Sequence, residues 1–265
     1  MVTNLPKGFY FRDSELPKSI QSKMTGKGFE YFDAEHTYLY DGQRMSGVTT
    51  ILNSTIAKPQ LIGWASRMCA EYIETEFTKW TEDKTAVFDI KAVCEAGKNA
   101  HTKKKEAGGA AGKDTHALAE EYIKLCIAAG GKPQIVPLDE KMQHLRDWAI
   151  KENITFIASE EKLYSKQMFV AGTADFIFEK EGKRYIGDIK TYKKLWDRVP
   201  MLQCAGYGLM WREMNGKDID GYCVFNLPKE REFNEVEDVK WSYDVAGDQE
   251  GFMAALSLYR ILANW

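Results

Sequence analysis

Two carboxylates are spaced so that they could hold a divalent cation, and a lysine lies close enough in sequence to act on a phosphate beside it. Asp175 falls in one predicted strand, and Asp188 and Lys190 fall two residues apart in the next. Because side chains alternate along a strand, Asp188 and Lys190 should share a face while Ile189 points into the apolar layer behind them. Two carboxylates and the Ile189 carbonyl are suitable oxygen ligands, and the ammonium could orient or deprotonate an attacking water. The spacing therefore predicts metal-dependent cleavage of a phosphodiester.

The same charges would also suit an exposed hairpin that turns at residues 180–183 and carries polar side chains on its solvent face. Two flanking segments favour the metal site instead. GKDTHALAE supplies a glycine, His116 and Glu120 at four-residue intervals, and MLQCAGYGLMW supplies Gln203 and Tyr207 one helical turn apart. The chain thus contains GxxxHxxxE, GxxD, DxK and QxxxY, in that order.

Over roughly residues 45–215 these four motifs resemble the RecB-like branch of the PD-(D/E)XK nuclease superfamily, in the form found in phage and mitochondrial single-strand exonucleases. The resemblance implies an α/β, restriction-endonuclease-like fold with a mixed sheet core flanked by helices. It also implies a metal-dependent DNA exonuclease acting on single strands or duplex ends, in phage-type recombination or DNA processing. A structure-specific endonuclease of the same fold and a catalytically silent nucleic-acid-binding subunit are the alternatives, and the intact D…DxK pattern argues against the silent one.

The resemblance also assigns roles by position. Asp175, Asp188 and the Ile189 carbonyl would hold Mg²⁺ or Mn²⁺, and His116 would be an additional metal ligand. Lys190 would be the catalytic lysine. The helical pair Gln203 and Tyr207 would support the site or contact the DNA backbone.

A third carboxylate is expected from the preceding strand, where SEEKLYS places Glu160 and Glu161 side by side. If Leu163 points to the apolar layer, Glu160 lies on the other face with Lys162 and Tyr164. If Tyr164 is the buried residue, Glu161 takes the active face, and this second arrangement is the one we select.

DNA contacts must come from local basic clusters, because the formal net charge is −3 and the pI is near 5.9. Basic residues interleaved with aromatic ones can neutralise phosphates while stacking on unpaired bases. A solvated helix face with the tryptophan in the core is the alternative for the second cluster. The first cluster is Lys103, Lys104 and Lys105, and the second is Tyr192, Lys193, Lys194, Trp196 and Arg198.

The cysteine positions and the hydropathy of the chain bear on two other possible partners, an iron–sulfur cluster and a membrane. The five cysteines are scattered, never in CxxC spacing, and none follows Cys223, so we expect no iron–sulfur cluster. The amino terminus has no charged lead before an apolar run, and no stretch reaches the length of a membrane span. We expect a soluble protein of the phage or bacterial host cytoplasm that binds DNA, and a recombination or single-strand-binding protein as a further partner.

The elements that must position these residues fit one elaborated domain of 265 residues. It would comprise a β-hairpin extension over residues 1–45, a helical portion over 46–153 that carries His116, and a catalytic α/β core over 154–265. The site should lie at one edge of the sheet. In the core, apolar periodicity predicts helices over 138–153, 199–214 and 247–265 and strands over 154–159 or beyond, 168–179, 184–191, 221–226 and 236–243.

Overall fold

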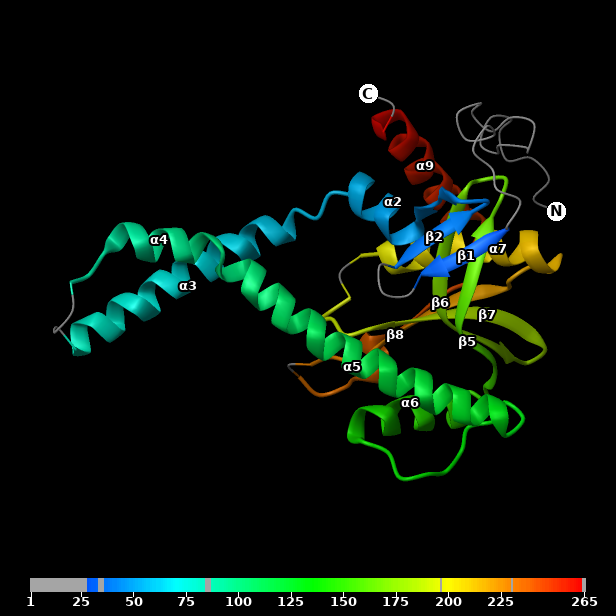
Figure 1. Cartoon of the computed structure of the whole chain (residues 1–265). Coiled ribbons are helices and arrows are strands. Elements are labelled where there is room, and N and C mark those ends of the chain that lie inside the picture. The colour runs from blue at the N-terminus through cyan, green and yellow to red at the C-terminus, as the bar shows by residue number, and fades with distance from the viewer. Residues whose placement is uncertain (1–27, 33–35, 84–86, 196, 230, 264–265) are drawn as a thin grey trace. The chain divides into compact units, whose positions relative to one another are not determined.

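The computed structural model describes residues 28–32, 36–83, 87–195, 197–229 and 231–263 of the mixed α/β chain (Figure 1). They form two compact units, one drawn from residues 1–56 and 115–265 and the other from 57–114. The sequence predicts one domain whose helical portion spans residues 46–153, and the second unit lies within that portion. Periodicity identifies helices, but it does not reveal against which core a helix packs.

The larger unit is built on a six-stranded mixed sheet with the order β4-β6-β7-β8-β9, in which β5 also pairs with β6. The β5–β6, β6–β7 and β8–β9 pairs are antiparallel, whereas β7 and β8 run parallel. The strands that carry Asp175 and Asp188, β6 and β7, are therefore inner strands, and the expectation of a site at a sheet edge is wrong. The strands are β4 (Ser46–Gly47), β5 (Thr155–Ser165), β6 (Val170–Lys180), β7 (Lys183–Lys190), β8 (Gly221–Asn226) and β9 (Val239–Ser242).

The turn between β6 and β7 has the geometry that a tight two-residue hairpin requires. Glu181 and Gly182 have φ of 53° and 74°, and Lys180 pairs with Lys183 across the turn. Two positive φ values in succession match the right-handed twist of the flanking strands. The turn at residues 180–183 thus joins the two strands that the sequence predicts over 168–179 and 184–191.

Helices cover both faces of the sheet and divide its core in two. On one face, α2 (Val48–Thr55), α7 (Val199–Asn215) and α9 (Val245–Ala263) pack against a cluster that includes Ile177 and Ile186. On the other face, the carboxyl-terminal part of α5 (Ala100–Ala128) and α6 (Glu140–Lys151) pack against Phe176, Phe178 and Ile189. The strand expected over residues 236–243 is shorter, because the short helix α8 (Glu235–Asp238) precedes β9.

The predicted amino-terminal hairpin is present as a separate antiparallel sheet of β1 (Phe29–Phe32), β2 (Thr37–Tyr40) and β3 (Gln43–Arg44). It packs on β5 and β6 through aromatic rings. The Phe29 and Tyr164 rings stack with centroids 4.4 Å apart, and the Tyr38 hydroxyl lies 2.9 Å from Thr173 Oγ1. The hairpin thus belongs to the larger unit.

The smaller unit consists of α3 (Gln60–Glu82), α4 (Ile90–Lys98) and the start of α5. Pro59 lies at the N-cap of α3, as its fixed φ favours. Gly97 allows close packing of α3 on α4, since a Cβ there would lie 3.3 Å from both Cys69 Sγ and Ile73 Cγ1. Within the described part of the chain, no helix is both long and apolar enough to cross a membrane.

Candidate active site

The site forms where β6 and β7 separate. Their pairing runs from Lys180–Lys183 to Phe176–Gly187 and ends there. One residue further, Asp175 Oδ2 accepts a hydrogen bond of 2.6 Å from the Ile189 backbone N–H. A side chain therefore takes the place that a backbone carbonyl occupies along the rest of the ladder, and this holds the Asp175 carboxylate beside the end of β7.

The regular alternation of side chains breaks at the same place. Ala174 belongs to the cluster under α7, whereas Phe176, two residues later, belongs to the cluster under α5 and α6. On β5 the residue facing this break is Glu160, between the pairs Ser159–Phe176 and Glu161–Ala174, and it has a φ of 53°. A left-handed glutamate is strained, and strain of this kind is concentrated at functional sites.

Gln203 on α7 connects the acidic and basic members of the site. Its Nε2 donates to Asp188 Oδ1 at 3.0 Å, and its Oε1 accepts from Lys190 Nζ at 3.4 Å. The opposite orientation of the amide would place like partial charges against each other on both sides. Gln203 can therefore bridge the two residues in one orientation only, which fixes their side chains on the face of β7 that the alternation predicted.

Tyr207 supports this bridge from the next helical turn. Gln203 Nε2 also donates to the Tyr207 hydroxyl at 2.9 Å, and the ring is buried against Gly172. A Cβ at Gly172 would lie only 2.6 Å from the ring, so the glycine of the GxxD motif makes room for Tyr207. Burial and the nearby carboxylates raise the pKa of the Tyr207 hydroxyl, which keeps it a neutral hydrogen-bonding group. Both QxxxY residues thus support the site.

The charged side chains of the site are largely buried. Asp188 is fully buried, Lys190 is 12% exposed, and Lys190 Nζ lies 2.5 Å from Asp188 Oδ2. Burial raises the pKa of Asp175 well above its usual range, and repulsion from Asp188 adds to this effect. For Lys190, burial would lower the pKa, but the Asp188 and Asp175 carboxylates outweigh it, and the pKa lies above its ordinary value. The lysine is therefore held as an ammonium.

His116 reaches the site from α5. Its Nδ1 lies 3.5 Å from Asp175 Oδ2. Burial lowers the pKa of His116, and the Lys190 charge lowers it further. A neutral imidazole is the form that binds metals. The structure thus brings His116, Asp175, Asp188, Ile189 and Lys190 together, as the motifs predicted.

The third carboxylate is better assigned to Glu160 than to Glu161. Leu163 is fully buried, and the Tyr164 ring is stacked on the amino-terminal hairpin, so the arrangement that we selected from the sequence is not the one found. The Glu160 carboxylate lies close enough to raise the pKa of Asp175 by repulsion. Lys162, whose Nζ lies 3.6 Å from Glu160 Oε2, partly balances its charge.

The donor set fits a hard divalent cation that keeps several water ligands. Asp188 Oδ2 is buried and makes no aligned hydrogen bond, although the Lys190 ammonium lies beside it. Among the described residues no three His, Cys, Asp or Glu side chains converge into a complete metal site. Mg²⁺, however, is often held by one or two carboxylates, with water and substrate phosphate as the other ligands. Asp175, Asp188 and the Ile189 carbonyl could supply such a partial shell.

The predicted DNA-contact residues lie in different environments. Tyr192, Lys193 and Lys194 follow β7 directly and are exposed. Arg198 instead donates to the buried Asp248 at 2.7 Å and to Ser242 at 3.1 Å, which is a structural arrangement. Trp196 lies outside the described residues, and the exposed cluster Lys103, Lys104 and Lys105 belongs to the unit of residues 57–114.

Three residues of the site region were not predicted from the sequence. Asn226 pairs in register with Lys190, and its side chain is joined to Asp238 and Arg231 in a polar network. The only signal in the sequence is an asparagine that ends the apolar run of β8. Nothing in the sequence links it to residues 231 and 238.

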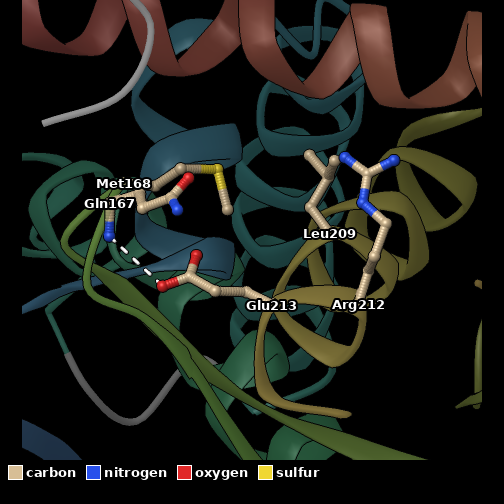
Figure 2. A pocket seen from close by; sticks show the side chains of 5 residues that line it. All are labelled: Gln167, Met168, Leu209, Arg212 and Glu213. Atoms are coloured by element: carbon tan, nitrogen blue, oxygen red, sulfur yellow. Dashed lines mark hydrogen bonds between the residues drawn. The ribbon is translucent and has the colours of Figure 1, made fainter. Parts of the chain in front are cut away.

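A pocket of about 150 Å³, whose lining side chains are drawn in Figure 2, contains none of the candidate site residues. It is lined by Gln167, Met168, Leu209, Arg212 and Glu213. The Glu213 carboxylate accepts hydrogen bonds from the backbone N–H groups of Lys166 and Gln167 at 2.8 and 3.3 Å. It thereby anchors the connection between β5 and β6, and we assign the pocket a structural origin.

Comparison with protein-family models and with curated proteins finds no match for this chain. Any assignment of function therefore rests on the motifs and on the geometry described above.

Proposed function

We propose that the protein is a metal-dependent deoxyribonuclease with a restriction-endonuclease-like core, of the RecB-like branch that its motifs resemble. The observation that carries the proposal is the constellation of Asp175, Asp188 and Lys190 at the point where β6 leaves β7, bridged by Gln203. A purely structural ion pair would not require a second, largely buried carboxylate whose pKa is raised by burial and by repulsion from the first.

The chain's own residues have distinct parts in phosphodiester hydrolysis. Asp175, Asp188 and the Ile189 carbonyl would hold Mg²⁺ or Mn²⁺, and His116 would complete the shell or help to hold a second ion. When bound, the ion would act as a Lewis acid on the scissile phosphate and supply a nucleophile at neutral pH.

The raised pKa of Lys190 favours one of its two possible roles. An ammonium cannot accept a proton, so Lys190 would orient the attacking water through hydrogen bonds and stabilise the negative charge that develops on phosphate oxygens. Gln203 keeps this ammonium directed to the acidic residues before substrate arrives.

End-labelled DNA tests the proposal. Linear single strands, blunt duplexes and circular single strands would be incubated with Mg²⁺, with Mn²⁺ or with a chelator. The Asp188→Asn protein, purified identically, controls for a contaminating nuclease. We expect linear strands to be degraded only with metal and only by the wild-type protein. Cleavage of the circles would identify the endonuclease alternative, and no metal-dependent cleavage of any substrate would overturn the proposal.

A further inference from the structure

A buried asparagine fixes the backbone directly beyond the candidate catalytic lysine. Asn226, the last residue of β8, is fully buried and lies opposite Lys190 in the parallel pair. Its Oδ1 accepts from the Tyr192 backbone N–H at 2.8 Å, and its Nδ2 donates to the Tyr192 carbonyl at 3.0 Å. The side-chain amide thus extends the pairing of β7 with β8 by acting as a strand partner for Tyr192.

Two further residues hold this asparagine in place. Asn226 Nδ2 donates to Asp238 Oδ1 at 2.6 Å, and Asp238 is fully buried. Arg231 binds both oxygens of Asp238 through Nη2 and Nη1, at 2.6 and 2.8 Å, and its Nε donates to the Lys193 carbonyl at 2.8 Å. Residues 192 and 193 are therefore held by one continuous network.

The network fixes the backbone of Tyr192 but leaves this residue partly exposed to solvent. Tyr192 as a residue is 48% exposed, although both polar groups of its backbone are bonded to a buried residue. Tyr192 lies two residues beyond Lys190, and its backbone is bonded to Asn226, which pairs in register with Lys190, so this segment lies beside the site. An exposed ring that is held next to a reacting phosphate is suited to stacking on an unpaired base.

We propose that Asn226, Asp238 and Arg231 form a latch that presents the Tyr192 ring to the nucleotide next to the scissile phosphate. The three latch members are positioning residues, and Tyr192 is the residue that contacts the substrate. The proposal rests on the proposed nuclease function and names a nucleobase subsite within it.

Arg184 provides a matched control for loss of stability alone. It lies on the same strand as Lys190 but near the opposite end, and its Nη2 donates to Glu179 at 2.6 Å. Its side chain is 20% exposed, against 26% for Arg231. Both substitutions by alanine remove an arginine from a carboxylate, but only Arg231→Ala breaks the latch.

A double-mutant cycle on a labelled single strand with Mg²⁺ tests the latch. We expect Tyr192→Ala and Arg231→Ala each to lower kcat/KM roughly tenfold, and the double variant to lose no more than either one. Arg184→Ala should leave kcat/KM within about twofold and combine with Tyr192→Ala multiplicatively. If Arg231→Ala does not fold, Arg231→Lys, which loses the bidentate contact, replaces it in the same cycle.

Hydrogen exchange at the Tyr192 amide gives a second readout that does not depend on cleavage. The exchange should accelerate in the Arg231 variant and remain unchanged in Arg184→Ala. Multiplicative effects of Tyr192→Ala and Arg231→Ala in an active protein, or unchanged exchange, would overturn the latch while leaving the nuclease proposal intact. A wild-type protein that cleaves no substrate would overturn both.

Discussion

The two halves of β7 differ in how they are paired: the first half has a strand on each side, and the second half has a strand on one side only. Residues 183–187 pair with β6 on one side and, from Tyr185, with β8 on the other, and the Tyr185 ring stacks on Phe178 with centroids 5.3 Å apart. Residues 188–190 keep only the β8 partner, and the Asp175 carboxylate replaces β6. Backbone pairing and aromatic packing at one end of the strand thus support buried charges at the other.

The second half of β7 lies beside a carboxyl group that lowers the stability of the folded state. A carboxyl group whose pKa is raised by burial and by a second carboxylate destabilises the folded state whenever it is ionised. The early half of β7 contains no such conflict among its described contacts. Substitutions in the late half should therefore affect cleavage first, and those in the early half should affect stability only.

The largest effect is expected from removing either charge of the DxK pair. Asp188→Asn and Lys190→Met preserve side-chain volume, and each should lower the rate of metal-dependent cleavage by at least about a hundredfold. Lys183→Met, an exposed lysine at the start of the same strand, is the control and should be fully active. Activity within tenfold of wild type in either DxK variant would contradict the site assignment.

Asp175→Asn should also impair cleavage and, at the same time, stabilise the metal-free protein. The folded-state pKa of Asp175 is raised, so the folded state binds its proton more tightly than the unfolded state does. The stability of the wild-type protein should therefore fall as the pH rises from the unfolded pKa through the raised folded pKa. The amide removes the charge but can still accept the Ile189 N–H.

Thermal melting in chelator across this pH range checks the prediction. The Asn variant should melt higher than wild type at neutral pH, by roughly 2–4 °C for each kcal/mol gained, and converge with it in acid. Added Mg²⁺ should raise the melting temperature of the wild type alone. A variant that melts lower than wild type at neutral pH would show that Asp175 stabilises the fold.

A smaller effect is expected from Gly172→Ala, which leaves every charged group in place. The new methyl group would press on the Tyr207 ring and displace the Gln203 bridge. We expect a loss of about 1–3 kcal/mol in unfolding free energy and a roughly tenfold lower cleavage rate. Gly63→Ala, in open space on α3, should instead be neutral or stabilising by up to about 1 kcal/mol. Unchanged activity in Gly172→Ala would show that the bridge tolerates movement.

The smallest effect on cleavage is expected at the turn that begins β7. Gly182 has a φ of 74°, so Gly182→Ala should cost about 1 kcal/mol through backbone strain. The cleavage rate should remain that of wild type at temperatures well below the melting transition. A parallel fall in cleavage would break the division of β7 into a supporting half and a reactive half.

Local patterns predicted most of the core. The two-residue period placed Asp188 and Lys190 on one face and Ile189 on the other, and the apolar run of β8 matched the observed residues 221–226. Helical spacing similarly placed Gln203 and Tyr207 together on α7. These predictions succeed because each depends on the geometry of a single regular element.

The sequence could not predict features that depend on departures from regular geometry or on distant contacts. A strict two-residue period cannot locate Asp175 and Glu160, because both lie where the alternation breaks and Glu160 is left-handed. The choice between Glu160 and Glu161 failed for this reason. The link between Asn226 and Asp238 joins a strand to a short helix across an irregular loop, where no periodic pattern applies.

The discontinuity of the larger unit has a consequence for the order of folding. Ser46 pairs with Val170, about 120 residues later in the chain, and the segment between them includes all of residues 57–114. Pairing over such a distance carries a high loop-closure entropy and slows folding. The helices of residues 57–114 contact mainly near neighbours in sequence and can form early, so β4 should be among the last strands to join the sheet during refolding.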